Sequence, residues 1–163
     1  MKKEKRELRL YGLVPYQLSG IQKGIQYGHA NDVFKVKYPK DVIHNEWIKK
    51  WKTYIVLNGG TTNENPKCLG TMQKHLATLR ANKIKVATFY EPDLNDTLTA
   101  IVFVVDERVF NKEKYPDFDM PLVRQFSPTK PQWETPSLNE WAKKKFGNQN
   151  AFLREFLKNF RLA

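Results

Sequence analysis

The chain has 163 residues, enough for one domain with its own hydrophobic core and too few for two domains of ordinary size. Hydrophobic residues make up 40% of it, but no apolar run approaches the roughly 20 residues of a membrane-spanning helix, so no membrane partner is expected. The formal net charge of +11 favours partners such as RNA, a nucleotide or an acidic protein.

Cysteine and histidine usage limits the chemistry. A single cysteine, Cys68, excludes an intrachain disulfide framework and predicts a reducing, cytoplasmic location. Cys68 follows a proline in a polar loop without an evident activating group, so a catalytic thiol is not expected. The histidines at 29, 44 and 75 are far apart and lack the spacing of metal ligands. We therefore expect neither a metal nor a cofactor.

A strand and a long helix are predicted at the start of the chain. Residues 8–15 alternate in polarity, which is typical of a strand. Ser19 and Gln22 have the spacing of a capping box, which predicts a helix from Ser19 to about Lys37.

One face of this predicted helix carries no side chains, because glycines recur at intervals of four residues: Gly20, Gly24 and Gly28. Each interior glycine lowers helix stability by roughly 0.5–1 kcal/mol relative to alanine. We therefore expect the bare face to pack closely on the sheet or to let a ligand approach closely. Beside it, Gln22, Gln26 and His29 form a polar stripe.

The middle of the chain alternates between helical and strand patterns. A short helix is expected over residues 46–52. The apolar run at 53–58 predicts a strand buried on both faces, as in a parallel sheet. A helix follows from Thr71 to about residue 82, with an apolar inner face of Met72, Leu76 and Leu79. His75 is expected on its exposed face.

Two further strands are predicted at 85–90 and 99–105, joined by the acidic turn at 91–96. Strands that alternate with helices indicate an α/β fold. We predict a mixed sheet of about four strands with helices on both faces, in a domain over residues 7–110.

The character of the sequence changes after Phe110. Residues 111–136 hold five of the nine prolines, which predicts an extended arm over the surface. Ser137 and Glu140 form a second capping box before a helix that ends at Gly147. A last helix, capped by Asn148, carries an aromatic stripe of Phe152, Phe156 and Phe160. We expect the two C-terminal helices of residues 111–163 to dock on the main core; the alternative is an oligomer or partner interface.

The order of elements and the motif Gln26-x-x-His29-Ala30 at the end of the first helix resemble the type II peptidyl-tRNA hydrolase family. The resemblance covers residues 7–110. It implies a small α/β enzyme, often a homodimer, that cleaves the ester between a peptide and the 3′ end of tRNA without a metal. The position of the family's catalytic lysine is held here by Gln22, and the nearest lysine, Lys23, is one residue further, about 100° around the helix.

The resemblance also suggests the roles of the catalytic candidates. Ester hydrolysis requires a group that activates water and donors for the developing oxyanion. Asp93 or Asp96 in the acidic turn is expected to orient the water. Lys23 or Gln22 is expected to donate to the oxyanion, and Thr99 matches a threonine of the family.

A ligand is expected at one edge of the sheet, where strands of α/β folds end. The loop from Asn58 to Thr62 follows a strand and offers amide and hydroxyl donors, although it also reads as an ordinary turn. Thr71 begins the next helix at the same rim. The candidate ligand-binding residues are Gln26, His29, Asn58, Gly59, Gly60, Thr61, Thr62, Thr71 and Glu91.

Two functions of different class remain open, and a third is weaker. In the first, the chain is a peptidyl-tRNA hydrolase-like enzyme acting on an RNA-linked ester. In the second, it binds a nucleotide or RNA without turnover, as a phage or mobile-element protein that sequesters a nucleotide signal would. In the third, the C-terminal aromatic helix makes it a protein-interaction module.

Overall fold

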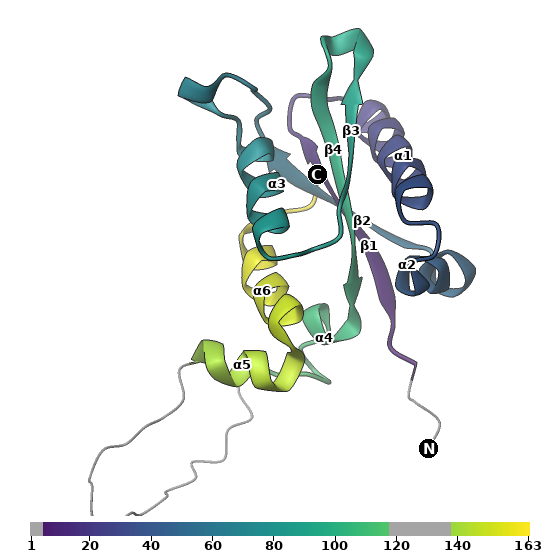
Figure 1. Ribbon diagram of the computed structural model, residues 1–163, viewed down its shortest axis with the longest axis vertical. Coiled ribbons are helices and arrows are strands. Elements are labelled where there is room, and N and C mark those ends of the chain that lie inside the picture. Colours follow the sequence, from purple (N-terminus) through teal and green to yellow (C-terminus); the bar gives the residue numbers. More distant parts are fainter. Residues whose placement is uncertain (1–4, 118–137) are drawn as a thin grey trace, which may run out of the picture.

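The computed structural model describes residues 5–117 and 138–163 and confirms the predicted α/β class (Figure 1). Its sheet has four strands in the order β2-β1-β4-β3. The strands are β1 (Leu8–Pro15), β2 (Thr53–Gly60), β3 (Ala87–Glu91) and β4 (Thr97–Asp106). β1 runs parallel to β2 and antiparallel to β4, and β3 and β4 form an antiparallel hairpin, so the sheet is mixed.

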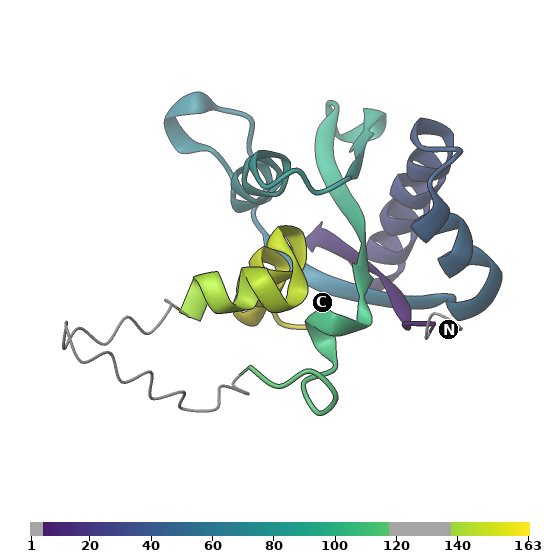
Figure 2. The ribbon, with the colours of Figure 1, turned by 60° about the horizontal axis from the view of Figure 1, so that its bottom comes forward.

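Helices cover both faces of the sheet (Figures 1 and 2). The longer ones are α1 (Gly20–Lys37), α3 (Thr71–Ala81), α5 (Leu138–Phe146) and α6 (Asn148–Phe156). Shorter helical segments are α2 (Val42–Glu46), a π-turn (Trp47–Trp51), α4 (Glu107–Phe110) and three 3₁₀ turns (Pro66–Cys68, Pro92–Leu94 and Leu157–Asn159). α1 lies over β3 and β4 on one face, and α3 and α6 lie on the other.

The side chains of β1 point alternately to the two faces of the sheet and contribute to both halves of the core. Leu10 and Val14 point to the α1 side, where they pack with Tyr27 and Phe34. Tyr11 and Leu13 point to the other side, where they pack with the inner face of α3. The predicted inner residues of α3 are indeed buried there: Met72, Leu76 and Leu79. A strand of this kind places successive side chains on opposite faces, so one central strand supports both layers.

The predicted close packing of the glycine face of α1 is wrong. An added Cβ would meet no atom within 4 Å at Gly20, Gly24 or Gly28, because that face points to solvent. The sheet-facing stripe is defined instead by Gln26, Tyr27, Ala30 and Phe34, all of them buried. The capping box of Ser19 and Gln22 is confirmed.

A glycine of β1 supplies the close contact that the helix glycines do not. The ring of Tyr27 lies against Gly12, where a Cβ would be 2.1 Å from the ring atom Cε2. The Tyr27 hydroxyl donates a hydrogen bond of 2.6 Å to the carbonyl oxygen of Leu10. Desolvation by burial raises the pKa of this phenol, so it remains a neutral donor.

β2 is an edge strand and is only partly buried, which corrects the prediction of a strand buried on both faces. Tyr54 is 52% exposed. The outer side of β2 is partly covered by the last residues of the chain. The amide of Asn58 donates to the carbonyl of Arg161, and the amide of Ala163 donates to the carbonyl of Val56.

The predicted aromatic stripe docks on the core of the same chain, as expected, although Phe160 lies beyond α6, after the 3₁₀ turn Leu157–Asn159. Phe152, Phe156 and Phe160 pack against the cluster that contains the α3 residues. His75 of α3 is half-buried against Phe156 and Phe160, which corrects its predicted place on an exposed face. Each of the three rings is half-buried by this contact, so the stripe is used within the chain.

The predicted ends of the C-terminal helices are close to those observed. α5 ends at Phe146, and Gly147, with φ +85°, separates it from α6. The N-cap of α6 is Gly147 rather than Asn148. Ser137 and most of the predicted extended arm lie outside the described residues. In the part of the chain that is described, no helix has the length and apolar character required to cross a bilayer.

Candidate functional site

Three chain segments meet at one edge of the sheet, as the sequence predicts: the start of α1, the loop after β2 and the turn between β3 and β4. β1 and β2 end there because they are parallel, and the hairpin turn between β3 and β4 lies there because β4 runs the opposite way. The amide of Tyr16, just after β1, donates to the carbonyl of Gly60 at the end of β2. α1 begins at this edge, so its first turns lie beside the hairpin (Figure 1).

Three predicted residues from two of these segments form a hydrogen-bonded group, here called the Gln26 cluster: Gln26, Glu91 and Thr99. The amide nitrogen of Gln26 donates to Oε2 of Glu91 at 2.5 Å. The hydroxyl of Thr99 donates to the amide oxygen of Gln26 at 2.7 Å. Gln26 is 6% exposed and Thr99 is 1% exposed, so both polar side chains depend on these bonds.

The direction of each hydrogen bond in the cluster follows from the Glu91 carboxylate. An ionised carboxylate only accepts hydrogen bonds, so the Gln26 nitrogen, not its oxygen, must be directed to Glu91. The Gln26 oxygen is then left for Thr99, whose hydroxyl therefore donates. The carbonyl of Phe89, at 3.3 Å, is the more distant acceptor for the same hydroxyl. The cluster thereby fixes the orientation of the Glu91 carboxylate.

The other predicted residues of this region, Asp93 and Asp96 of the hairpin and His29 of α1, do not belong to the cluster. Oε1 of Glu91 accepts a long bond, 3.4 Å, from the amide of Asp93. The side chains of Asp93 and Asp96 are exposed in the turn, where Asn95 and Asp96 adopt positive φ angles of 54° and 53°. The ring of His29 stacks on Phe89, with centroids 4.6 Å apart.

Lys23 and Gln22 differ in their relation to the cluster. Gln22 is exposed, and its side-chain oxygen accepts from the amide of Ser19 in the capping box. Lys23 precedes Gln26 by three residues and Tyr27 by four, so it belongs to the sheet-facing stripe of α1. Lys23 is half-buried, and within the described residues no acid forms an ion pair with its ammonium group. The structure therefore brings Lys23, rather than Gln22, to the side of α1 that carries the cluster.

Several polar groups of the loop from Asn58 to Thr62 are bonded within the protein. The amide of Gly60 donates to the side chain of Asn58, and the amide of Thr61 donates to the hydroxyl of Thr71. Thr62 accepts from Gln73 on α3. These bonds anchor the start of α3 to β2.

Close packing accounts for both glycines of this loop. A Cβ at Gly59 would be 2.2 Å from the Met72 sulfur, and one at Gly60 would be 2.1 Å from the Thr71 hydroxyl. Gly60 also has a φ of +85°. The features of this loop are therefore those of a structural turn, on the opposite side of the sheet from α1.

Sequence reasoning missed two exposed aromatic side chains at this edge of the sheet. Tyr16 is 57% exposed after β1, and Tyr90 is 39% exposed next to Glu91. Exposed aromatic rings can serve as platforms for stacked bases. The signal was the position of each tyrosine at a predicted strand end, where a core role is not required.

Comparison with known proteins adds no family assignment: no model of a protein family matches the chain, and no curated protein matches it. Among residues 5–117 and 138–163, no three His, Cys, Asp or Glu side chains gather as metal ligands would. The site is consequently defined by its own geometry: an oriented carboxylate, a buried amide and hydroxyl, and a lysine one turn away on α1.

Proposed function

We propose that this protein is peptidyl-tRNA hydrolase-like and acts on an RNA-linked ester at the Gln26 cluster. The observation that carries the proposal is the pair of hydrogen bonds that join Gln26 of α1 to Glu91 and Thr99 of the β3–β4 hairpin. They hold a carboxylate in one orientation at the edge of the sheet, and the half-buried Lys23 lies three residues before Gln26 on α1. The net charge of +11 would attract a polyanionic substrate such as tRNA to this edge.

In this proposal Glu91 orients the attacking water. One of its oxygens is held by Gln26, and among the residues that the structure describes the other accepts only the long bond from Asp93, which leaves lone pairs for a water molecule. A carboxylate so placed can accept a proton as the water attacks the ester carbonyl. Asp93 and Asp96 remain the alternative candidates for this role.

Lys23 supplies the positive charge in the same proposal. A tetrahedral intermediate of ester hydrolysis carries an oxyanion, and a donor that meets it lowers the barrier. Lys23 is the cation of the sheet-facing stripe of α1 nearest to Gln26. Tyr16 and Tyr90, which are exposed at the same edge of the sheet, would offer rings on which bases of the RNA stack. His29 stacks on Phe89 on the α1 side of the sheet.

Incubation with peptidyl-tRNA, followed by an acid gel that separates charged from free tRNA, tests the activity. We expect Glu91→Gln and Lys23→Ala each to lower turnover by about a hundredfold, the usual cost of losing one such group. Lys35→Ala is the matched control, since Lys35 is an exposed lysine of the same helix. Equal turnover in all four proteins would exclude the cluster as the catalytic site.

A second candidate function is binding of a nucleotide or RNA without turnover. The observation that favours it is the capping box, which occupies Gln22 at the position of the family's lysine. Purified protein would then carry ultraviolet-absorbing nucleotide and would not cleave peptidyl-tRNA. A phage or mobile-element protein that sequesters a nucleotide signal would behave in this way.

Salt dependence separates the two ligand classes of the binding function. Each phosphate contact releases counterions, so tRNA affinity should fall steeply between low and physiological salt. A mononucleotide has few phosphates and should show a shallow slope. A salt-independent affinity would contradict a polyanionic ligand altogether.

A cytoplasmic homodimer is part of the same proposal. The solvent face of α1 carries Ile21, 79% exposed, and Ile25, 50% exposed, beside the three bare glycines. Such a face lets a second helix approach closely. Sedimentation at several protein concentrations tests the dimer, and Ile21→Glu should shift the equilibrium to monomer if this face is used.

A further inference from the structure

A groove of about 690 Å³ lies at the end of the sheet opposite the Gln26 cluster. It is lined on one side by Val104 and Asp106 of β4, and on the other by residues 82–85 and the first turn of α6. Its volume is in the range of small-molecule sites, roughly 300–1,000 Å³. The proposed hydrolase function does not use it.

The groove opens where β4 continues beyond its partner β3. The last pair between these strands is Ala87 with Val102, while β4 continues to Asp106. The amide of Glu107 donates to Glu7, on the β1 side. Because partners alternate in an antiparallel ladder, the backbone groups of Val104 and the amide of Asp106 are directed to the other side, toward the groove.

These backbone groups are unused within the described part of the chain. No hydrogen bond joins the amide or the carbonyl of Val104 to residues 82–86, which diverge from β4 at this point. A short stretch of unpaired strand edge at the floor of a groove is the feature that extended peptides recognise by adding a strand.

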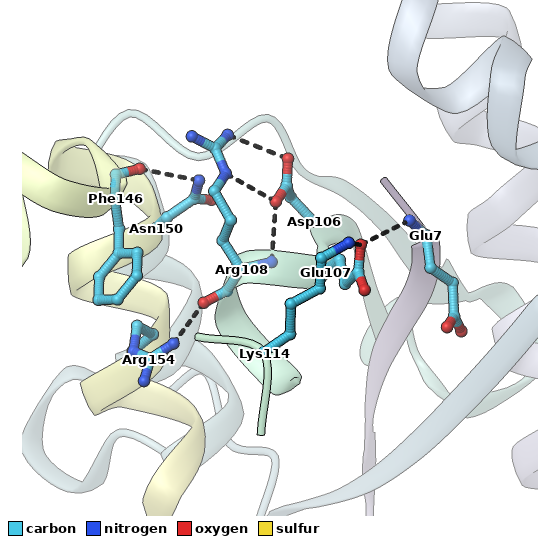
Figure 3. Close-up of polar contacts among 8 residues, drawn as sticks. All are labelled: Glu7, Asp106, Glu107, Arg108, Lys114, Phe146, Asn150 and Arg154. Carbon is cyan, nitrogen blue, oxygen red and sulfur yellow. Dashed lines mark hydrogen bonds and ion pairs between the residues drawn. The ribbon is translucent and has the colours of Figure 1, made fainter. Parts of the chain in front are cut away.

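The charges around the groove favour an acidic partner. Its two acids are already paired, Asp41 with Lys85 at 2.6 Å and Asp106 with Arg108 at 2.8 Å. Figure 3 shows the second pair beside Asn150 of α6, with the Arg108 guanidinium bound to Asp106 by two hydrogen bonds. Lys83 lines the groove without an ion-pair partner among the described residues.

A second hollow of about 710 Å³ extends this cationic surface. It shares Asn82, Lys83 and Asn148 with the groove and adds Lys143, which also has no ion pair within the described residues. Its acid, Glu155, is paired with Lys158 at 2.7 Å. The charge left uncompensated around both hollows is therefore positive.

From the unpaired edge and this charge we infer that the groove binds an extended acidic peptide segment of a partner protein, which adds a short strand beside Val104 and places a carboxylate near Lys83. Backbone bonds to β4 would provide affinity independent of sequence. The lysines would select acidic over basic segments.

Fluorescence anisotropy with a labelled peptide of alternating valine and glutamate tests the inference on the full chain. We expect it to bind at least about tenfold more tightly than the same peptide with lysine in place of glutamate. A third peptide, N-methylated at alternate amides, should lose about tenfold because it cannot pair with the strand.

Two variants assign the binding to the groove. Val104→Pro removes the groove-directed amide without removing a bond to β1, and should weaken binding about tenfold, while Val104→Ala keeps the amide and should not. Lys83→Glu changes an exposed side chain and should weaken binding about tenfold whether or not the proline variant folds. Absence of binding of the acidic peptide, or binding that Lys83→Glu and N-methylation both leave unchanged, overturns the inference. The inference is also overturned if the binding of single-stranded RNA depends on Lys83 and the binding of the acidic peptide does not.

Discussion

The ring of Tyr27 occupies the space that a side chain at Gly12 would need, so α1 approaches the sheet through a glycine of β1. A Cβ at this position would be 2.1 Å from Cε2 and 2.2 Å from Cδ2 of the ring. The Tyr27 hydroxyl is held at the same time by Leu10. The helix therefore cannot move away without losing a buried hydrogen bond.

Gly12→Ala should destabilise the protein by about 1–3 kcal/mol, the usual cost of overpacking a core.

Gly24→Ala should have the opposite effect and stabilise it by about 0.5–1 kcal/mol, because Gly24 is an exposed helix position with no neighbour within 4 Å. Urea unfolding of the two variants measures both. If Gly24→Ala were destabilised instead, the glycine face of α1 would be closely packed, contrary to the structure.

Thr99→Val should destabilise the protein by about 1–3 kcal/mol, because it removes the donor to a buried amide oxygen. Thr99→Ser keeps the hydroxyl and serves as the control. Thermal unfolding provides the comparison, and equal melting temperatures for the valine variant and the parent would show that the Gln26 cluster is not formed.

The free energy of unfolding should decrease when the pH falls below the ordinary histidine pKa, because of His75. Burial lowers its pKa from the usual 6.5, so the unfolded chain binds the proton more readily than the folded one. The stability is retained above about pH 6.5 and declines as the pH falls below it. His44 is shifted in the same direction by burial, so the parent contains both contributions.

His75→Phe isolates the contribution of His75. Phenylalanine keeps the ring contacts with Phe156 and Phe160 but does not titrate. The melting temperature of the variant should fall less than that of the parent between about pH 7 and pH 5. Parallel curves would mean that His75 is solvated in the folded protein.

At lower pH the attachment of α6 should weaken through Asp117. Hydrogen bonds from Lys112 and Arg154 lower the pKa of this carboxyl to about 2, so its contribution is present above its ordinary value of 3.8 and lost as the pH falls through about 2. Asp117→Asn should remove that part of the acid dependence of the melting temperature. The Arg154 guanidinium also donates to the carbonyls of Arg108 and Tyr115, so the variant should stay folded near neutral pH.

Local signals predicted the elements well, because they depend on neighbours in sequence. The capping box at Ser19 and the inner face of α3 are examples, since both follow from helix geometry alone. The convergence of Gln26 and Glu91 at one edge followed from strand direction. Their actual bond could not be predicted, because it depends on the rotation of α1 about its axis.

The glycine face shows why the sequence does not determine that rotation. Gly20, Gly24 and Gly28 define a smooth surface, but a smooth surface does not reveal what it contacts. The glycine that does pack closely against α1 is Gly12, which lies on β1 and belongs to no periodic pattern. The groove beside Val104 likewise cannot be predicted from local sequence, because it results from unequal strand lengths in a hairpin.

The position of β4 has a consequence for how the chain folds. β1 and β4 pair from Leu8 with Asp106 to Leu13 with Ile101, so a central contact of the sheet joins residues almost a hundred positions apart. Contacts of such long range slow folding, because a large loop must close first. The β3–β4 hairpin can form locally beforehand. We therefore expect its insertion beside β1 to limit the folding rate, and substitutions on the shared face of β1 and β4 to slow refolding more than substitutions in α6.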